Sequence, residues 1–216
     1  DGYCARLDTR MESVKVLGLV NITVLAAGSI FTGSVHEPIK GTKNPQKMLQ
    51  TGIPFTKKPV ALQFDYKVKM SDRENRIRAT GFSKITDVPG KDYPAAILLL
   101  QKRWEDANGN VYAKRIGTMV TYYYHSTDWK NNVTYEIMYG DITNRPEYKA
   151  HMMRLQATES YTVNSKGESV PIHEVAWGDE NDVPTHMYIQ FTSSHGGAYI
   201  GSPGNTLWVD NVKLVY

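Results

Sequence analysis

The chain has 216 residues, and its 25 basic and 22 acidic side chains leave a formal net charge of +3. No block of five or six like charges occurs, which excludes a basic nucleic-acid-binding arm and a basic membrane-surface patch as the main feature of the protein. The single cysteine, Cys4, excludes an internal disulfide and leaves the compartment open.

The composition favours strands over helices, because 14 tyrosines and recurrent turn residues accompany few Ala- or Leu-rich stretches. A single sandwich often reaches about 200–250 residues, so we expect one domain over residues 1–216. The chain starts at Asp1 without an initiator Met. We interpret it as a trimmed product, the C-terminal part of a longer exported precursor.

Two features mark the first third of the chain. The apolar run 14–31 includes polar residues and glycines and is rich in β-branched side chains, so it predicts a buried strand pair over 14–25 rather than a membrane span. The connection 36–59 is long and punctuated by prolines, and we expect Ile53 and Phe55 to pack it against the domain.

The clearest strand covers residues 62–70, where apolar and polar side chains alternate. Its predicted core face carries Leu62, Phe64, Tyr66, Val68 and Met70, and its solvent face carries Gln63, Asp65, Lys67 and Lys69. Such alternation is typical of an antiparallel sheet with one face in water. Residues 71–94 are charged and turn-rich and predict mostly loop, whereas the apolar run 95–100 predicts a strand covered on both faces.

The middle of the chain combines a hairpin turn with further strands. Asp106–Gly109 contains an Asn-Gly pair, which tolerates the positive φ that tight hairpins need. Further strands are predicted at 111–117, 118–124 and 133–139. A short helix is predicted over 146–160, where Tyr148, Met152 and Leu155 have helical spacing, and an acidic loop is predicted over 176–184.

The last third contains two strands separated by glycine-rich breaks. Met187, Ile189 and Phe191 alternate with polar residues and predict a half-buried strand. The breaks fall at 193–197 and 201–205. The closing run 207–216 is so apolar and β-branched that we expect a central strand, which carries one out-of-place carboxylate, Asp210. Roughly nine or ten strands with turns between them predict an all-β antiparallel sandwich of jelly-roll, galactose-binding-like type.

Several stretches together resemble a known family. They are Ala27–Gly33, Gly52–Thr56, Lys58–Leu62, Tyr66-Lys67, Ser193-Ser194, Gly196-Gly197 and Gly204–Val212. This pattern is similar to the putative carbohydrate metabolism domain of exported proteins of gut bacteria, over most of residues 26–216. The resemblance implies a jelly-roll sandwich, a cell-surface or periplasmic setting, and a role in glycan binding or processing. Its motifs are structural and nominate no catalytic residue.

The closing strand also resembles the last strand of many jelly-roll carbohydrate-binding modules, in which an aspartate helps to hold a structural calcium ion. Asp210 matches that position, and the resemblance therefore implies a structural calcium there as the only cofactor. The usual pattern has two successive acids, whereas Asn211 stands second here, although an amide oxygen can also bind calcium. The alternative is that Asp210 accepts hydrogen bonds from a neighbouring loop.

Two predicted polar loops, 125–132 and 176–184, offer the residue types that a glycan site needs. Trp129 follows Asp128 in 125–132, just after Tyr124, and Trp177 lies beside Asp179 in the acidic loop. Flat aromatic rings bury the C–H faces of sugars, and acid and amide groups bind their hydroxyls. We therefore predict Trp129, Trp177, Asp128, Asp179 and Tyr124 as the carbohydrate-binding residues. The alternative is that both indoles pack over the ends of the sandwich.

Hydrolysis would need a pair of carboxylates about 5–9.5 Å apart. The acids near predicted loops or strand ends are Asp179, Glu180, Asp182, Glu105 and Glu136, and their spacing marks no pair. Asp128 and Asp179 would form one only if their loops converge. Ser193, Ser194 and His195 lack the surroundings of a nucleophile elbow, so a strand that ends in a tight turn explains them better.

We therefore favour a non-catalytic module that recognises a glycan within an exported glycan-utilisation protein. The first alternative is a glycoside hydrolase with loop carboxylates, and the second is a protein-interaction or adhesion domain. We expect a glycan or oligosaccharide partner, no nucleic acid and no membrane span, with the protein at the cell surface or in the periplasm.

Overall fold

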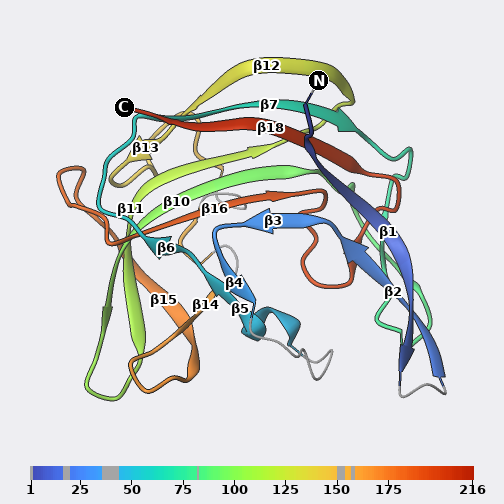
Figure 1. Cartoon of the computed structure of the whole chain (residues 1–216), viewed down its shortest axis with the longest axis horizontal. Coiled ribbons are helices and arrows are strands. Elements are labelled where there is room, and N and C mark those ends of the chain that lie inside the picture. The colour runs from blue at the N-terminus through green and yellow to red at the C-terminus, as the bar shows by residue number, and fades with distance from the viewer. Residues whose placement is uncertain (1, 17–19, 36–43, 82, 150–153, 157–158) are drawn as a thin grey trace.

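The computed structural model describes residues 2–216 except 17–19, 36–43, 82, 150–153 and 157–158. An outer sheet of five strands packs on a larger inner sheet, and a small sheet of three strands adjoins β2 (Figure 1). The predicted all-β antiparallel sandwich is confirmed, with two parallel strand pairs as exceptions. Within the described residues, no helix is long and apolar enough to cross a membrane.

The outer sheet places the last strand of the chain in its middle. Its order is β12 (Thr127–Glu136), β7 (Ala61–Lys69), β18 (Thr206–Val215), β1 (Ala5–Val16) and β2 (Val20–Ala27). All neighbours are antiparallel. The prediction that the closing strand is central is therefore confirmed, because β18 is hydrogen-bonded on both sides.

The inner sheet is longer and contains most of the short strands. Its order is β3 (Ser29–Phe31), β16 (His186–Thr192), β10 (Ala95–Glu105), β11 (Val111–Tyr122), β15 (Ser169–Trp177), β14 (Tyr161–Val163), β5 (Leu49–Thr51) and β4 (Gly33–Val35). In addition, β13 (Met138–Tyr139) pairs with β11, and β6 (Ile53–Pro54) pairs with β16. The small sheet contains β17 (Ile200–Gly201), β8 (Arg76–Arg78) and β9 (Thr86–Val88).

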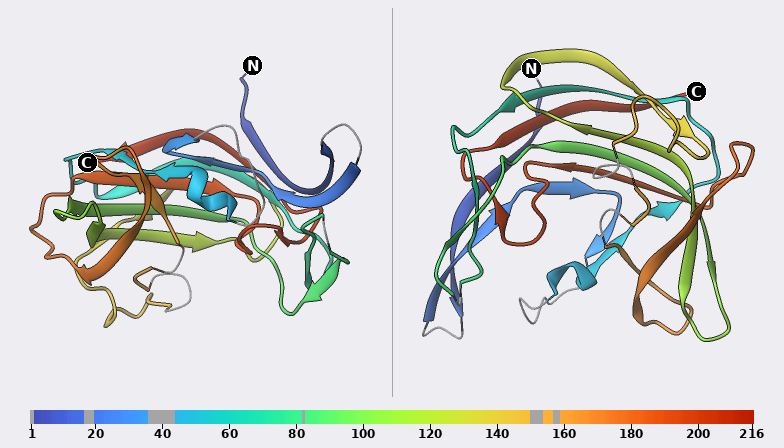
Figure 2. Two further views of the ribbon diagram at one scale, coloured as in Figure 1. Left: turned by 90° about the horizontal axis from the view of Figure 1, so that it is seen from below. Right: turned by 180° about the vertical axis from the view of Figure 1, so that it is seen from behind.

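One end of the inner sheet curls until it closes into a ring (Figure 2). β5 pairs with β14, and β6, which follows β5 after Gly52, pairs with β16. The strands β16, β10, β11, β15, β14 and β5 therefore surround a common interior. Gly52 permits this closure, because its φ is +89° and a Cβ there would lie 2.6 Å from Nη2 of Arg103.

The core fills the space between the two sheets, as the alternation along 62–70 predicts. Leu62, Phe64 and Val68 are at most 1% exposed, and they face Met187 and Phe191 of β16. The rings of Phe64 and Phe191 meet edge to face with centroids 4.9 Å apart. Burying each such side chain contributes about 1.5–3 kcal/mol, so this alternation determines how the sheets face each other.

The predicted loop over 125–132 is wrong, since most of it belongs to β12. This strand lies at the edge of the outer sheet. Seven of its ten residues are exposed and the other three are half-buried, and no apolar alternation marks its first part, 127–132. The predicted loop 71–94 likewise contains β8 and β9. The strand 95–100 and the hairpin at 106–109 are confirmed, with φ +93° at Gly109.

Two further predictions need correction. The described part of 146–160 forms turns and bends instead of a helix, and Met152 lies outside the described residues. The connection 36–59 contains β5, β6 and a 3₁₀ helix, Pro45–Met48, over its described part. Phe55 packs against the core as predicted, whereas Ile53 stays 37% exposed.

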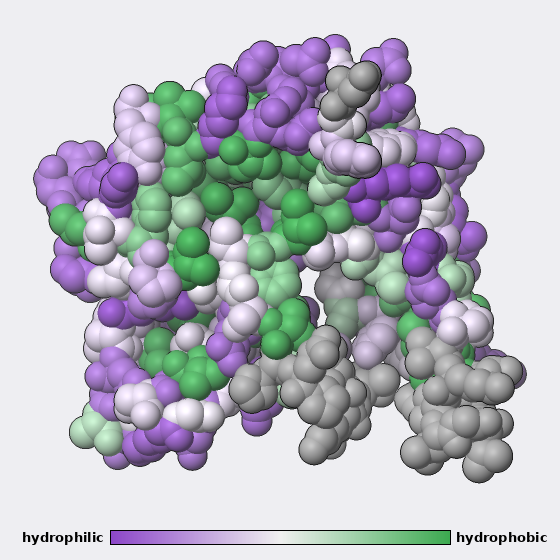
Figure 3. All heavy atoms as spheres, in the orientation of Figure 1, coloured by the Kyte–Doolittle hydropathy of each residue, from purple (hydrophilic) through white to green (hydrophobic). Residues whose placement is uncertain are grey.

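Apolar side chains also remain uncovered at the open edge of the sandwich. Ile30 and Ile53 lie opposite Phe191 and Met187, so they share the core side of the inner sheet, yet they are 39% and 37% exposed. Figure 3 shows apolar residues gathered on this side of the molecule, between the outer sheet and β16. The outer sheet therefore does not cover the whole inner sheet.

Candidate functional site

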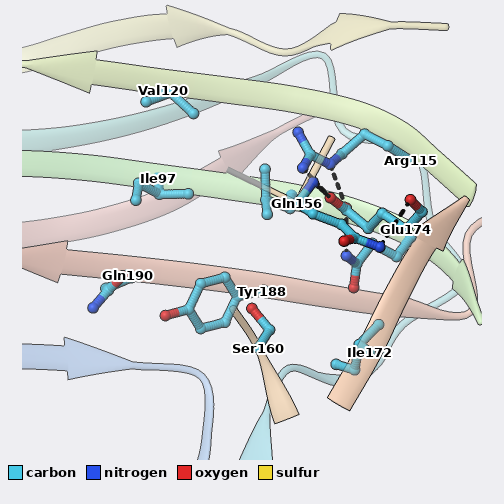
Figure 4. A pocket seen from close by; sticks show the side chains of 11 residues that line it. Ile97, Arg115, Val120, Gln156, Ser160, Ile172, Glu174, Tyr188 and Gln190 are labelled. Atoms are coloured by element: carbon cyan, nitrogen blue, oxygen red, sulfur yellow. Dashed lines mark hydrogen bonds and ion pairs between the residues drawn. The ribbon is translucent and has the colours of Figure 1, made fainter. Parts of the chain in front are cut away.

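The face of the inner sheet that points away from the core forms a depression beside the ring. Because successive side chains in a strand point to opposite faces, burial of Leu98, Met119 and Ile189 in the core turns their neighbours to this face. Its lining includes Ile97, Leu99, Gln101, Arg115, Val120, Gln156, Ser160, Ile172, Glu174, Tyr188 and Gln190. Figure 4 shows these side chains, which come from β10, β11, β15 and β16 and from the segment before β14.

The size of the depression limits what it can enclose. The space that the centre of a water molecule can occupy in the depression measures about 40 Å³, and all of its empty space, open solvent included, measures about 500 Å³. An enclosed volume of this size holds about three water molecules, whereas sites that bury a whole ligand measure about 300–1,000 Å³. A sugar ring therefore fits only over the mouth, with one substituent in the enclosed part.

A buried ion pair between Arg115 and Glu174 forms the inner wall of the depression (Figure 4). Nε of Arg115 donates to Oε1 of Glu174 at 2.5 Å, and Nη2 donates to Oε2. Oε1 also accepts from Nε2 of Gln101 at 2.6 Å, and Oε2 accepts from the backbone N–H of Gln156 at 2.8 Å. Each carboxylate oxygen thus accepts two hydrogen bonds.

These contacts fix the protonation state of Glu174. Burial alone would raise the pKa of its carboxyl. The hydrogen bonds from Arg115, Gln156 and Gln101 and the positive charge of Arg115 outweigh burial, and they lower the pKa below its ordinary value. Glu174 is therefore ionised at neutral pH. A carboxylate held in this way is a poor general acid, because it carries no proton to donate.

A second arginine lies deeper in the ring. Nε of Arg103 donates to Oε1 of Gln101 and Nη1 donates to the carbonyl of Thr51, both at 2.8 Å. Burial lowers the pKa of Arg103 to about 10, against the opposing effect of Glu174, so the guanidinium is still charged at pH 7. Burial and the charge of Arg103 also lower the pKa of His186 to about 4, which leaves its imidazole neutral.

The other end of this face carries an aromatic cluster. Tyr93 lies 4.7 Å from Tyr124, 5.5 Å from His195 and 6.5 Å from Tyr122, measured between ring centroids. Tyr124 is 41% exposed, and the ammonium of Lys149 lies 5.7 Å from its ring. The cluster therefore presents ring surface to solvent beside the depression.

The predicted carbohydrate-binding residues are divided between the two sheets. Trp177, at the end of β15, has its ring 5.6 Å from the guanidinium carbon of Arg115 and packs on the cluster around Val120, so it borders the depression. Tyr124 belongs to the aromatic cluster at the other end. Trp129 and Asp128 instead lie exposed on β12, the edge strand of the outer sheet.

Asp179 belongs to a tight local turn. Its carboxylate accepts the N–H of Asn181 at 2.8 Å, while its own N–H donates to Asp182 at 3.0 Å. Asp182 also binds Lys102 at 2.9 Å. Asp179 and Asp182 therefore stabilise their own loop, and Asp182 also ties this loop to Lys102 of β10.

Neither of two depressions among the described residues is lined by a pair of carboxylates. Glu174 is the single acid in the lining of the first. A second, wider depression of about 460 Å³, lined by Val60, Ala61, Thr134, Glu136, Ile137 and Tyr139, likewise contains one acid, Glu136. Asp128 and Asp179, the pair considered from the sequence, lie on different sheets or their connections.

Ser194, His195 and Asp92 lie together, but not as a catalytic triad. Oγ of Ser194 donates to Asp92 at 2.9 Å, and Nδ1 of His195 accepts the N–H of Tyr93 at 3.0 Å. A nucleophile would need the serine hydroxyl on the histidine. The structural interpretation of this stretch is therefore the better one, since the serine fastens the turn to a buried carboxylate.

Asp210 lies at a bulge of β18, opposite Asp65 of β7. Oδ1 of Asp210 accepts the N–H of Asn211 at 2.8 Å. Asp65 accepts the N–H of Asn132 at 2.5 Å and Nδ2 of Asn211 at 2.7 Å. These oxygens hold two irregular backbone positions, and the described residues contain no group of three or more His, Cys, Asp or Glu arranged for a metal. The calcium role of Asp210 stays a prediction.

Comparison with solved structures identifies a similar fold. The structure resembles that of a putative glycoside hydrolase from Bacteroides thetaiotaomicron, with a TM-score of 0.54 and 18% sequence identity. The similarity covers 97% of this chain and 57% of the other, so this chain spans little more than half of its neighbour's length. No curated protein matches the sequence.

The family model described as "Putative carbohydrate metabolism domain" matches residues 1–215, nearly the whole chain. It agrees with the resemblance carried by the turn glycines and strand cores, and the structural neighbour has a related architecture. The chain belongs to the putative carbohydrate metabolism domain family.

Proposed function

We propose that this domain recognises a carbohydrate without cleaving it, on the depressed face of the inner sheet. The observation that carries the proposal is the state of Glu174. It is the single carboxylate in the lining, and all its contacts with Arg115, Gln101 and Gln156 hold it ionised. Glycosidases of the usual kind need a second carboxylate within about 5–9.5 Å.

The rest of the face has the chemistry of a sugar-binding surface. Tyr188 and the aromatic cluster with Tyr124 supply flat rings, and Gln190 and Ser160 supply hydrogen-bonding groups in the lining. Trp177 borders the same depression. In this arrangement the sugar stacks over the mouth and its hydroxyls bind the amide and hydroxyl groups.

The test is a glycan-array screen of the purified domain, followed by calorimetry and by mass spectrometry of the recovered oligosaccharides. We expect binding with intact ligand. Tyr188→Ala and Trp177→Ala should each weaken binding about tenfold, since a lost stacking ring costs about 1–2 kcal/mol. Trp129→Ala is the matched control on the outer sheet. If Trp129→Ala alone abolishes binding, the site moves to β12 with Asp128.

Glycoside hydrolysis is the alternative, since the structural neighbour is titled a putative glycoside hydrolase. Shortened products in the mass spectra would support it, and their loss in Glu174→Gln would assign the chemistry to this depression. Products that persist in that variant would direct the search to Glu136 in the second depression.

A protein-interaction role is a second alternative, favoured by the apolar residues at the open edge near Ile30 and Ile53. Absence of binding to every glycan on the array would support it. We also propose an exported setting, on the strength of the family, which fractionation of cells expressing the full-length protein would test.

A further inference from the structure

The buried end of the depression carries an unbalanced positive charge. Arg115 of the lining and Arg103, which lies behind the lining residue Gln101, supply two cations, and Glu174 of the lining supplies one anion. The neighbouring His186 is neutral at pH 7 and adds nothing. Among the described residues, Arg115 has Glu174 as its ion-pair partner, and none of the ion pairs involves Arg103.

The partners of Arg103 are neutral acceptors that shield it without cancelling its charge. The Oε1 atom of Gln101 and the carbonyl of Thr51 accept its hydrogen bonds. Gln101 also donates to Glu174, so one side chain separates Arg103 from the carboxylate. Because the interior of the ring excludes most water, this charge is screened far less than a surface charge would be.

The carboxylate of Glu174 is occupied by its own hydrogen-bond donors. Its four hydrogen bonds, two on each oxygen, point the carboxylate at Arg115, Gln101 and the backbone of Gln156. Apart from Arg115 and Glu174, the lining consists of uncharged side chains such as Tyr188 and Gln190. An anion in the depression therefore meets two cations and one acid, and that acid, Glu174, is already engaged in four hydrogen bonds.

We infer that the ligand is an acidic glycan whose carboxylate or sulfate group enters the enclosed part of the depression. The inference rests on the proposed function and names the substrate class of the same site. The 40 Å³ open to the centre of a water molecule leaves room for one such substituent, while the sugar ring stays over the mouth. The hydroxyl and amide groups of Ser160, Tyr188 and Gln190 also line the depression and can donate hydrogen bonds to its oxygens.

The test compares matched ligands that differ only in charge. Uronate-containing oligosaccharides and their carboxyl-reduced forms, together with sulfated and desulfated pairs, are titrated into the wild-type domain at low and at high salt. We expect the acidic member of at least one pair to bind tenfold or more tightly, with an advantage that shrinks as salt is added. Equal binding of both members overturns the inference and leaves the proposed function standing, whereas binding to no glycan overturns both.

Two substitutions locate the charge. Arg103→Met should remove the preference for the acidic ligand, and Arg103→Lys should keep most of it, because lysine restores the charge even where the fork geometry is lost. Lys130→Met removes an exposed cation of β12 and is the matched control. Thermal melts show whether each variant folds. A preference that survives in folded Arg103→Met, or that is lost in Lys130→Met, assigns the selectivity elsewhere and contradicts the inference.

Discussion

Two carboxylates are buried among the described residues, Asp92 and Glu174, and the fold satisfies them in different ways. Asp92 accepts hydrogen bonds from Oγ of Ser194 at 2.9 Å, the N–H of Ser202 at 2.8 Å and Nδ2 of Asn205 at 3.2 Å. Glu174 instead has a full cation, Arg115, as its main partner.

The two carboxylates therefore have different roles: Asp92 anchors a loop, whereas Glu174 sets the charge inside the ring. The donors around Asp92 lie along one stretch, 194–205, so this carboxylate gathers a glycine-rich loop against the strands. The donors around Glu174 come from β10, β11 and the segment before β14, so this carboxylate joins strands across the ring and fixes the charge of its interior.

The largest effect on stability is expected when the buried carboxylate of the ring, Glu174, is removed. Glu174→Ala should lower the free energy of unfolding by about 3–5 kcal/mol, because it leaves Arg115 buried without its partner. Urea unfolding measures the loss, with Glu136→Ala on β12 as the exposed control. A loss below about 1 kcal/mol would show that the cation does not depend on Glu174.

Removing the other carboxylate should have a smaller and more local effect. Asp92→Ala should cost about 2–3 kcal/mol, since several buried donors lose their acceptor but the loop can admit water. Hydrogen exchange should speed up at the amides of His195 and Ser202 and stay unchanged in β15. Faster exchange throughout the ring would contradict the assignment of Asp92 to the loop.

Replacing both members of the ion pair sharpens the distinction between stability and function. Arg115→Met combined with Glu174→Leu should change the unfolding free energy by no more than about 1 kcal/mol, in either direction, because apolar packing often matches a buried ion pair. We expect the same double variant to lose glycan binding. A double variant as unstable as Glu174→Ala would mean that the pair is needed for folding.

Acid should act on the ring through Glu174. Its pKa lies below the ordinary value of 4.5, so the ionised carboxylate stabilises the folded protein at pH values above 4.5, and this stabilisation is lost as the pH falls through the lowered pKa. The difference in stability between wild type and Glu174→Gln should therefore stay constant from pH 7 to about 5 and shrink below pH 4. A constant difference down to pH 2 would contradict the lowered pKa.

Trp129→Ala is the smallest change we expect, because the indole is 42% exposed on an edge strand and far from both buried carboxylates in the order of the strands. The unfolding free energy should shift by less than about 0.5 kcal/mol. A larger loss, measured in the same urea titration, would show that the indole of Trp129 supports the bulged backbone of β12.

Strands with one face in the core could be predicted from the sequence. The alternation along 62–70 and 187–192 marks both core faces, because water and the core select opposite side chains at successive positions. The first part of β12, 127–132, lacks such a pattern, since its residues are polar on both faces apart from Trp129. The ring was not predictable, because 49–54 pairs with strands more than a hundred residues later in the chain.

The two charged residues of the depression stand in a recognisable position in the sequence. Glu174 follows Ile172 at a spacing of two, and Arg115 follows Ala113 and Val111 in the same way. Each charge therefore stands on the inward face of a strand, where an ionised group needs a partner. Their pairing with each other depends on the parallel contact of β11 with β15, which no local pattern reveals.

The central place of β18 has a consequence for how the protein is made. During synthesis β7 and β1 leave the ribosome long before residues 206–215, and their facing edges have no strand to join them until then. At about 5–20 residues per second, these edges wait several seconds, open to pairing with other chains. A nascent chain stalled before residue 206 should therefore be far more prone to aggregation than the finished domain.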